Sequence, residues 1–119
     1  MLVGCGVEPV NGCDPHAALD ATAIDQVEIG FGGVHGYDYA PACLRVRRGT
    51  QLRFTGPFEV HPLGAGSFRD GQVEPTSDGP FRETATGREV TFVASEPGSY
   101  GFFCHFHVSE GMAGAVFVE

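Results

Sequence analysis

The sequence has few basic residues and no long apolar run, and these absences exclude several classes of protein. Seven Lys and Arg residues stand against fifteen Asp and Glu residues, which gives a formal net charge of −8 at pH 7. This balance disfavours nucleic acid as a partner, because phosphate backbones bind basic surfaces. No apolar stretch approaches the roughly 18 residues that a membrane-spanning helix needs. We expect the acidic charge to serve solubility or the docking of a basic partner.

Tryptophan, internal repeats and a complete secretory signal peptide are also missing. Positions 2–5, Leu-Val-Gly-Cys, resemble the end of a bacterial lipoprotein signal, but only four residues precede Cys5, too few for a signal. We expect either a trimmed chain that is anchored to a membrane through a lipidated Cys5 or a free thiol in a tail. Residues 1–12 lack periodicity and are predicted to be an N-terminal tail or linker ahead of a single domain at 13–119.

Glycine, phenylalanine and short alternating apolar segments make up much of the chain, with 18 Gly, 10 Phe and 8 Pro. Short apolar runs between Gly and Pro are typical of sandwiches and barrels. We predict an all-β fold, a Greek-key β-sandwich or barrel of seven to eight strands. Residues 63–87 are Gly-rich and polar, and are predicted to be a long irregular loop. The individual strands are predicted at 26–31, 39–48, 50–55, 58–61, 89–94, 100–104 and 113–119.

Apart from the segments at 57–62 and 100–112, a hairpin over residues 39–55 is the clearest local prediction. Leu44 and Val46 alternate with arginines, and the returning segment places Leu52 and Phe54 in phase after a glycine turn. Alternation of this kind indicates strands with one buried face. The arginines are expected to lie on the solvated face.

Four side chains carry donor atoms that suit a metal. Cys104, His107 and Met112 follow one another with the spacing C-x2-H-x4-M, and His61 lies upstream between Val60 and Pro62. A soft thiolate, two imidazoles and a weak axial thioether are the donor set that suits copper. The thiol would lie at the buried end of a strand, and a tight turn at Gly111 would bring His107 and Met112 back to the same point.

These motifs resemble the cupredoxins, or blue copper proteins, in the plastocyanin and pseudoazurin style of ligand loop. The resemblance covers residues 27–119 and rests on Phe54…His61, Tyr100-x-Phe-x-Cys104, His107 and Gly111-Met112-x-Gly114. It implies one copper ion per chain, Cu(I) or Cu(II), held by His61, Cys104 and His107 in a near-trigonal plane with Met112 as the long axial ligand. The implied function is one-electron transfer, not enzyme catalysis.

Other functions stay open at this point. A copper-binding or delivery protein, a copper enzyme domain on a cupredoxin scaffold and a zinc-binding structural domain use similar donors. Repeated Met and His tracts would favour delivery, and the chain has none. Catalytic metal sites keep an open position, and Met112 argues against one here. We expect His16, His35 and His105 to be loop or surface residues. The motif itself has a structural alternative, in which Cys104 and Met112 are core residues and His107 is a loop residue.

Hydrogen bonding to the sulfur is expected to differ from the family pattern. The residue after the upstream histidine commonly gives a backbone N–H to the thiolate, but here it is Pro62, which has none. Phe106, before His107, does have an N–H. The resemblance also implies that His107 is the point where electrons enter and leave, within an apolar patch. The candidates for this patch are Leu63, Val108, Met112, Ala113, Pro57 and Phe58.

Three cysteines remain once Cys104 is assigned to the metal. Cys13 and Cys43 lie beside and within the predicted domain, so we predict a disulfide between them, with Cys5 left over. A disulfide implies an oxidising compartment; in a reducing one the pair would be small buried residues. We expect an extracytoplasmic monomer, in the periplasm or at the cell surface. Its partner is expected to be a redox protein, a cytochrome or an oxidoreductase, that docks near His107.

Overall fold

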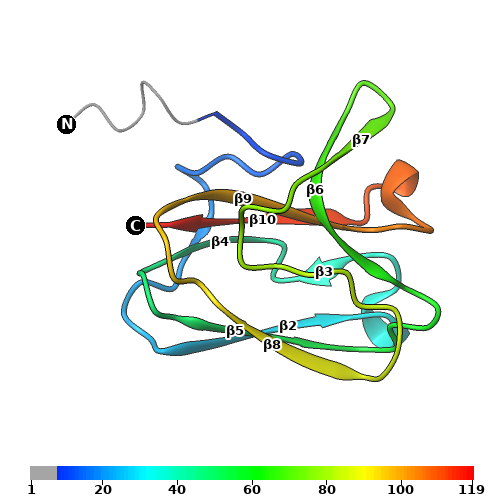
Figure 1. The fold of residues 1–119 in the computed structure, drawn as a ribbon, viewed down its shortest axis with the longest axis horizontal. Coiled ribbons are helices and arrows are strands. Elements are labelled where there is room, and N and C mark those ends of the chain that lie inside the picture. Colours follow the sequence, from blue (N-terminus) through cyan, green and yellow to red (C-terminus); the bar gives the residue numbers. More distant parts are fainter. Residues whose placement is uncertain (1–7) are drawn as a thin grey trace.

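The computed structural model describes residues 8–119, and these form two β-sheets that pack face to face (Figure 1). Cys5 and the lipoprotein-like motif lie outside the described residues. One sheet has the strand order β1-β4-β10-β9-β6-β7 and the other β3-β2-β5-β8. The predicted all-β sandwich is confirmed. The strands are β1 (Leu19–Asp20), β2 (Gln26–Phe31), β3 (Tyr39–Ala40), β4 (Cys43–Val46), β5 (Gln51–Thr55), β6 (Leu63–Arg69), β7 (Gln72–Pro75), β8 (Glu89–Val93), β9 (Gly98–Cys104) and β10 (Ala113–Val118).

Ten strands are present in the described residues, more than the seven to eight predicted. The segment predicted as one strand at 39–48 is divided into β3 and β4 around Pro41, since proline cannot donate to a ladder. The strands β6 and β7 form a hairpin inside 63–87, where no regular element was expected. Asp70 and Gly71 both have positive φ at its turn, as a type I′ turn requires. The glycines in β6 interrupt the apolar alternation by which a strand is recognised in a sequence.

Residues 58–61, predicted as a strand, form a turn instead. The backbone N–H groups of Val60 and His61 both donate to the carbonyl oxygen of Pro57, at 3.3 and 3.1 Å. Phe58 and His61 are buried while Val60 between them is exposed. Two buried residues three positions apart fit one face of a tight turn, which alternation over so short a segment cannot distinguish from a strand.

The predicted hairpin over 39–55 is wrong, although its buried residues are correct. Leu44, Val46, Leu52 and Phe54 are all fully buried. However, β4 pairs with β1 and β10, whereas β5 pairs with β2 and β8 in the other sheet. The link between them therefore crosses from one sheet to the other. Both strands turn alternate residues towards the same core from opposite sides, so a hairpin and a crossing give the same sequence pattern.

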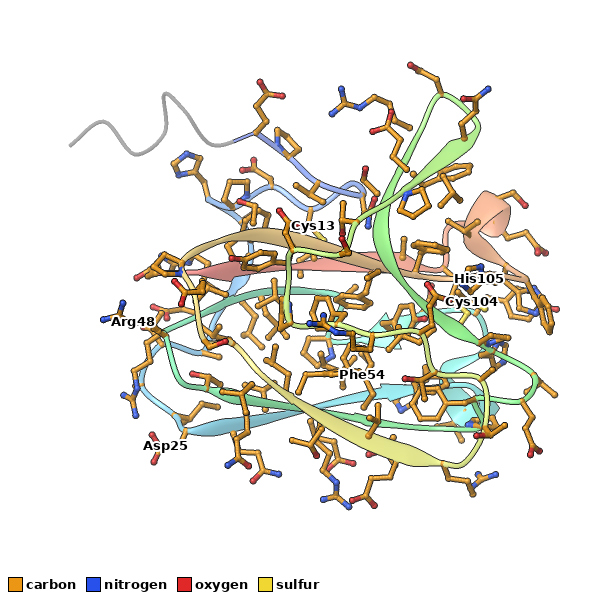
Figure 2. All side chains as sticks on the ribbon, in the orientation of Figure 1. Cys13, Asp25, Arg48, Phe54, Cys104 and His105 are labelled. Atoms are coloured by element: carbon orange, nitrogen blue, oxygen red, sulfur yellow. A yellow bond between two sulfur atoms is a disulfide. The ribbon has the colours of Figure 1, made fainter. Side chains whose placement is uncertain are left out.

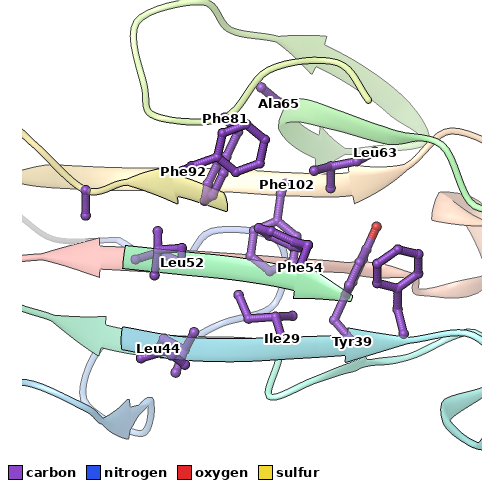
Figure 3. Close-up of a cluster of buried hydrophobic side chains, with 14 of the residues drawn as sticks. Ile29, Tyr39, Leu44, Leu52, Phe54, Leu63, Ala65, Phe81, Phe92 and Phe102 are labelled. Atoms are coloured by element: carbon purple, nitrogen blue, oxygen red, sulfur yellow. The ribbon is translucent and has the colours of Figure 1, made fainter. Parts of the chain in front are cut away.

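Phenylalanine fills the space between the sheets. The ring of Phe54, on β5, makes edge-to-face contacts with Phe81, Phe92 and Phe102, with centroids 5.7, 5.9 and 5.0 Å apart (Figure 3). Each such pair contributes about 0.5–1.5 kcal/mol beyond its buried area. Phe102 lies two residues before Cys104 on β9, so this packing fixes the strand that carries the thiol.

The N-terminal segment is fastened to the larger sheet by a side-chain amide. Asn11 lies in the part of the predicted 1–12 tail that the structure describes. Its Nδ2 lies within 3.2 Å of the carbonyl oxygens of Gly66, Phe102 and Gly114, and its Oδ1 accepts the N–H of Phe68 at 2.8 Å. Asn11 thus joins three strands of one sheet.

Among residues 8–119, no helix is long and apolar enough to cross a membrane.

A disulfide joins Cys13 to Cys43, as predicted, with a Cα–Cα distance of 5.4 Å. It ties the N-terminal segment to β4, which lies between β1 and β10 in the same sheet. Cys104 is the free cysteine among the described residues, and it is buried. Structural disulfides are typical of proteins that work in oxidising compartments.

Replacing Cys13 and Cys43 together by serine is expected to lower the free energy of unfolding by about 3 kcal/mol. The bridge closes a loop with a sequence separation of 30, and its loss frees the unfolded chain. Urea titrations of the double variant and of the wild type under reductant should show the same lower midpoint. A double variant as stable as the oxidised wild type would contradict this role.

Candidate metal centre

The predicted donors come from loops and strand ends at one end of the sandwich, opposite the end that holds Arg48 (Figure 2). Cys104 is the last residue of β9, and Met112 directly precedes β10. His107 precedes a short 3-10 helix, η2 (Val108–Glu110). His61 ends the turn between β5 and β6. Two segments, the turn before β6 and the connection from β9 to β10, thus supply the four side chains.

His61 and Cys104 meet although they are far apart in sequence. The Nδ1 of His61 lies 3.7 Å from the Sγ of Cys104, across a sequence separation of 43. Both side chains are buried. Burial, and then the nearby charge of His107, lowers the pKa of His61. The lowered pKa favours the neutral imidazole, the form in which histidine binds metals.

Strand pairing explains why these two side chains meet. Leu63 at the start of β6 lies opposite Cys104 in the antiparallel β6–β9 pair. The N–H of His105 then donates to the carbonyl oxygen of Pro62 at 2.9 Å. Because His61 directly precedes this fixed pair, its position relative to the thiol is set by the backbone.

The turn after η2 returns the chain towards the thiol, as predicted from Gly111. Gly111 has φ 98 in the left-handed region, which favours glycine, and its N–H donates to Val108. The N–H of Met112 donates to the carbonyl oxygen of His107 at 3.2 Å, and the N–H of Cys104 donates to that of Met112 at 3.0 Å. Met112 is fully buried in the same core cluster as Cys104.

The thiol of Cys104 is buried, and nearby backbone and charged groups act on its pKa. Burial raises the pKa of Cys104, while hydrogen bonds from the N–H groups of Phe106 and His107 act in the opposite direction, and the charge of Glu110 raises it further. The direction of the Phe106 contribution agrees with the expectation that its N–H takes the place of the N–H that Pro62 lacks. The N–H of His107 acts in the same direction, which the sequence does not indicate.

His107 lies beside the other donors but also contacts a carboxylate. Its ring centroid is 5.0 Å from that of His61, and its side chain is 21% exposed. Its Nδ1 lies 3.0 Å from the Oε1 of Glu110. Within residues 8–119, no group of three or more His, Cys, Asp and Glu side chains is arranged to hold a metal ion. The set that converges is His61, Cys104 and Met112, with His107 at its edge.

A loop that sequence analysis treated only as a turn covers the two imidazoles. It contains the 3-10 helix η1 (Gly33–His35) and follows β2. The ring of Tyr37 stacks on that of His107, with centroids 3.9 Å apart and an angle of 15° between the planes. A Cβ on Gly32 would lie 3.2 Å from the Cδ2 of His61 and 2.8 Å from Pro57. No spacing motif marks Tyr37, so only the fold could reveal this contact.

The exposed apolar residues at this end are not those predicted. Of the residues proposed for a surface patch, Leu63, Phe58, Met112 and Val108 are buried. Pro57 and Ala113 are half-buried. The burial of Leu63 and Phe58 follows from the β6–β9 pairing and from the turn at 58–61, which point these side chains inwards. The large apolar side chains that are exposed on the loops at this end are Val34, Tyr37, Val60 and Phe106. His105 is a surface residue, as predicted, and pairs with Glu83 at 2.5 Å.

A two-sheet sandwich with a buried thiol, imidazole and thioether at one end has the fold of the cupredoxins, and this donor set suits copper. Residues 26–119 match the family described as copper binding proteins, plastocyanin/azurin family, and the chain belongs to this family. No curated protein matches the sequence.

Solved structures with a similar fold include a purple cupredoxin, a pseudoazurin and an amicyanin. A novel purple cupredoxin from Nitrosopumilus maritimus is 26% identical with a TM-score of 0.56, covering 78% of this chain and 99% of that one. A pseudoazurin from Methylobacterium extorquens AM1 is 25% identical with a TM-score of 0.52, covering 79% and 75%. Amicyanin from Paracoccus versutus is 22% identical with a TM-score of 0.51, covering 80% and 82%. The last likeness concerns the fold alone.

Replacing Gly32 by alanine is expected to disturb His61 and to destabilise the protein more than the same change at Gly36. Both glycines have positive φ, 72 and 62, so both variants carry backbone strain. Only at Gly32 would the new Cβ meet neighbours, Pro57 and His61. We expect Gly32→Ala to lose about 1–3 kcal/mol more, the usual range for overpacking, and to shift the His61 ring resonances in NMR spectra. Equal losses with unchanged His61 resonances would contradict this.

Proposed function

We propose that this protein is a one-electron carrier with a single type 1 copper site formed by His61, Cys104, His107 and Met112. The observation that carries the proposal is the buried approach of the His61 Nδ1 to the Cys104 Sγ, 3.7 Å, in a chain of the copper-binding plastocyanin/azurin family. A bound copper ion would supply the couple between Cu(I) and Cu(II). Thiolate and thioether suit the reduced ion, and imidazole suits both states.

The four side chains would have different tasks. The lowered pKa of His61 favours its neutral form, and its Nδ1, which lies near the sulfur, would bind the ion. Cys104 would bind as a thiolate, which the N–H groups of Phe106 and His107 stabilise. Met112 is buried next to Cys104 and would be the weak axial donor. His107 would exchange its contact with Glu110 for the ion. Because its ring is already 5.0 Å from that of His61, a side-chain adjustment is enough.

The surrounding protein supports electron transfer in two ways. The β6–β9 and β9–β10 pairings and the phenylalanine core hold Cys104 and Met112 in place, so little rearrangement would accompany a change of valence. Burial of these residues keeps water and substrates away from the sulfur donors. His107, the partly exposed member of the set, would then be the point where electrons enter and leave.

A redox protein is the partner that this surface would serve. Exposed Val34, Tyr37, Val60 and Phe106 lie on the loops that carry or cover the candidate ligands, and the net charge of −8 favours a basic partner. A cytochrome or an oxidoreductase docking near His107 is our proposal. The Cys13–Cys43 bridge fits a periplasmic or cell-surface location, and a lipid on Cys5 would anchor the chain there.

Copper titration with redox cycling is expected to separate this function from its alternatives. The wild type should take up one copper per chain and develop an intense visible thiolate-to-copper band that vanishes on reduction and returns on oxidation. Cys104→Ser should lack the band, whereas His105→Ala, a change at an exposed neighbour, should keep it. Copper uptake without reversible one-electron behaviour would indicate a delivery protein. Failure to bind copper would reject the proposed site.

Phe106→Pro is expected to lower the reduction potential of the copper protein by roughly 40 mV, the one-electron equivalent of a hydrogen bond of about 1 kcal/mol. The variant loses one of the two backbone N–H groups that lower the pKa of Cys104 and would bond to its sulfur. A thiolate with fewer hydrogen bonds donates more strongly and favours the oxidised state. Phe106→Leu keeps the N–H and should keep the potential. Voltammetry that gives an unchanged or raised potential for Phe106→Pro would refute the assignment.

A further inference from the structure

Tyr37 makes a contact with His107 that differs from the other aromatic contacts of the site. The two rings are nearly parallel, at 15° with centroids 3.9 Å apart, whereas the contact of Tyr37 with His61 is edge-on at 6.0 Å. Tyr37 is 47% exposed, so burial in the core does not explain its position. One face of the His107 ring is covered by this single side chain.

The loop that carries Tyr37 is fixed in place. Within it, the N–H of His35 donates to Gly32 at 2.8 Å, that of Gly36 to Gly33 at 3.1 Å and that of Asp38 to His35 at 3.1 Å. It begins after Phe31 and ends before Tyr39, and both of these flanking residues are buried. Tyr37 therefore lies two residues from a core anchor, in a hydrogen-bonded turn.

The same loop also touches the other imidazole. Gly32 has φ 72, and a side chain there would press on His61 and Pro57. The loop at 32–38 thus approaches His61 with its first residue and His107 with Tyr37. A loop that existed only to connect β2 to β3 would not need both close approaches.

We propose that Tyr37 is a positioning residue for His107. Its ring, held by the loop at 32–38, stacks on the imidazole and restricts rotation of the His107 side chain. Glu110 contacts the edge of the same imidazole at Nδ1, so the stack is what holds the ring when Nδ1 exchanges Glu110 for a metal ion. This role in metal binding rests on the proposed function, while the restraint on the ring exists without metal.

NMR spectroscopy of the metal-free protein tests the restraint itself. The ring protons of His107 should be shifted upfield by the ring current of Tyr37. Tyr37→Phe keeps an aromatic ring and should keep this shift, whereas Tyr37→Leu should lose it. Val34→Ala is the matched control, because Val34 lies on the same loop, is 98% exposed and should leave the shift unchanged. His107 resonances that are the same in Tyr37→Leu and wild type would overturn the proposal.

Release of copper to a chelator tests the consequence for the metal. Tyr37→Leu should release the ion about 2- to 10-fold faster than wild type, the factor that an aromatic pair provides, while Tyr37→Phe and Val34→Ala should match wild type. Equal release from Tyr37→Leu and wild type would overturn the positioning role even if the ring-current shift is lost. A wild type that takes up no copper would instead reject the proposed function, and the metal-free spectra would alone decide the role of Tyr37.

Discussion

The approach of His61 to Cys104 is the contact on which the rest of this structure depends. Neither residue alone defines a site, because one ends a turn and the other ends a strand, at a sequence separation of 43. The pairing of Leu63 with Cys104 and the bond from His105 to Pro62 fix the two segments side by side. An imidazole and a thiol are thus brought together by backbone hydrogen bonds before any ion is considered.

The remainder of the fold holds the contact of His61 with Cys104 in place and shields it from water. The rings around Phe54 hold β5 against β9, and Asn11 with the Cys13–Cys43 bridge closes the other face of the larger sheet. At the site end, two loops complete the enclosure. The Gly111 turn brings Met112 into the same core cluster as Cys104, and the loop at 32–38 contacts both imidazoles. The side chains of the β-sandwich core and those of the candidate site therefore pack together as one unit.

Sequence alone names three side chains that the fold brings together, those of His61, Cys104 and Met112, because their chemistry is in the residue types and their spacing. That they bind a metal stays a prediction. The sequence also predicts the disulfide. The bounds of β2 are predicted as well, because strict alternation over that segment allows only a strand. It fails at 39–55, because alternation reports which residues are buried but not which sheet they belong to. Only the pairing of β4 with β10 resolves that ambiguity.

The contacts around the site are the least predictable part. Tyr37 and His107 are stacked but come from segments that share no periodicity, and no local rule relates a loop tyrosine to a distant histidine. The same holds for the exposed apolar residues, since Leu63 and Met112 are buried by strand pairing and by a turn that the sequence does not specify. Such features follow from the tertiary fold.

X-ray absorption at the copper edge of the stoichiometrically loaded protein, measured in both oxidation states, tests the central claim most directly. We predict one short copper–sulfur bond and two imidazole nitrogens in each state, with no added oxygen ligand. A copper ion without a short sulfur bond, or one that carries a water in the oxidised protein, would contradict the account.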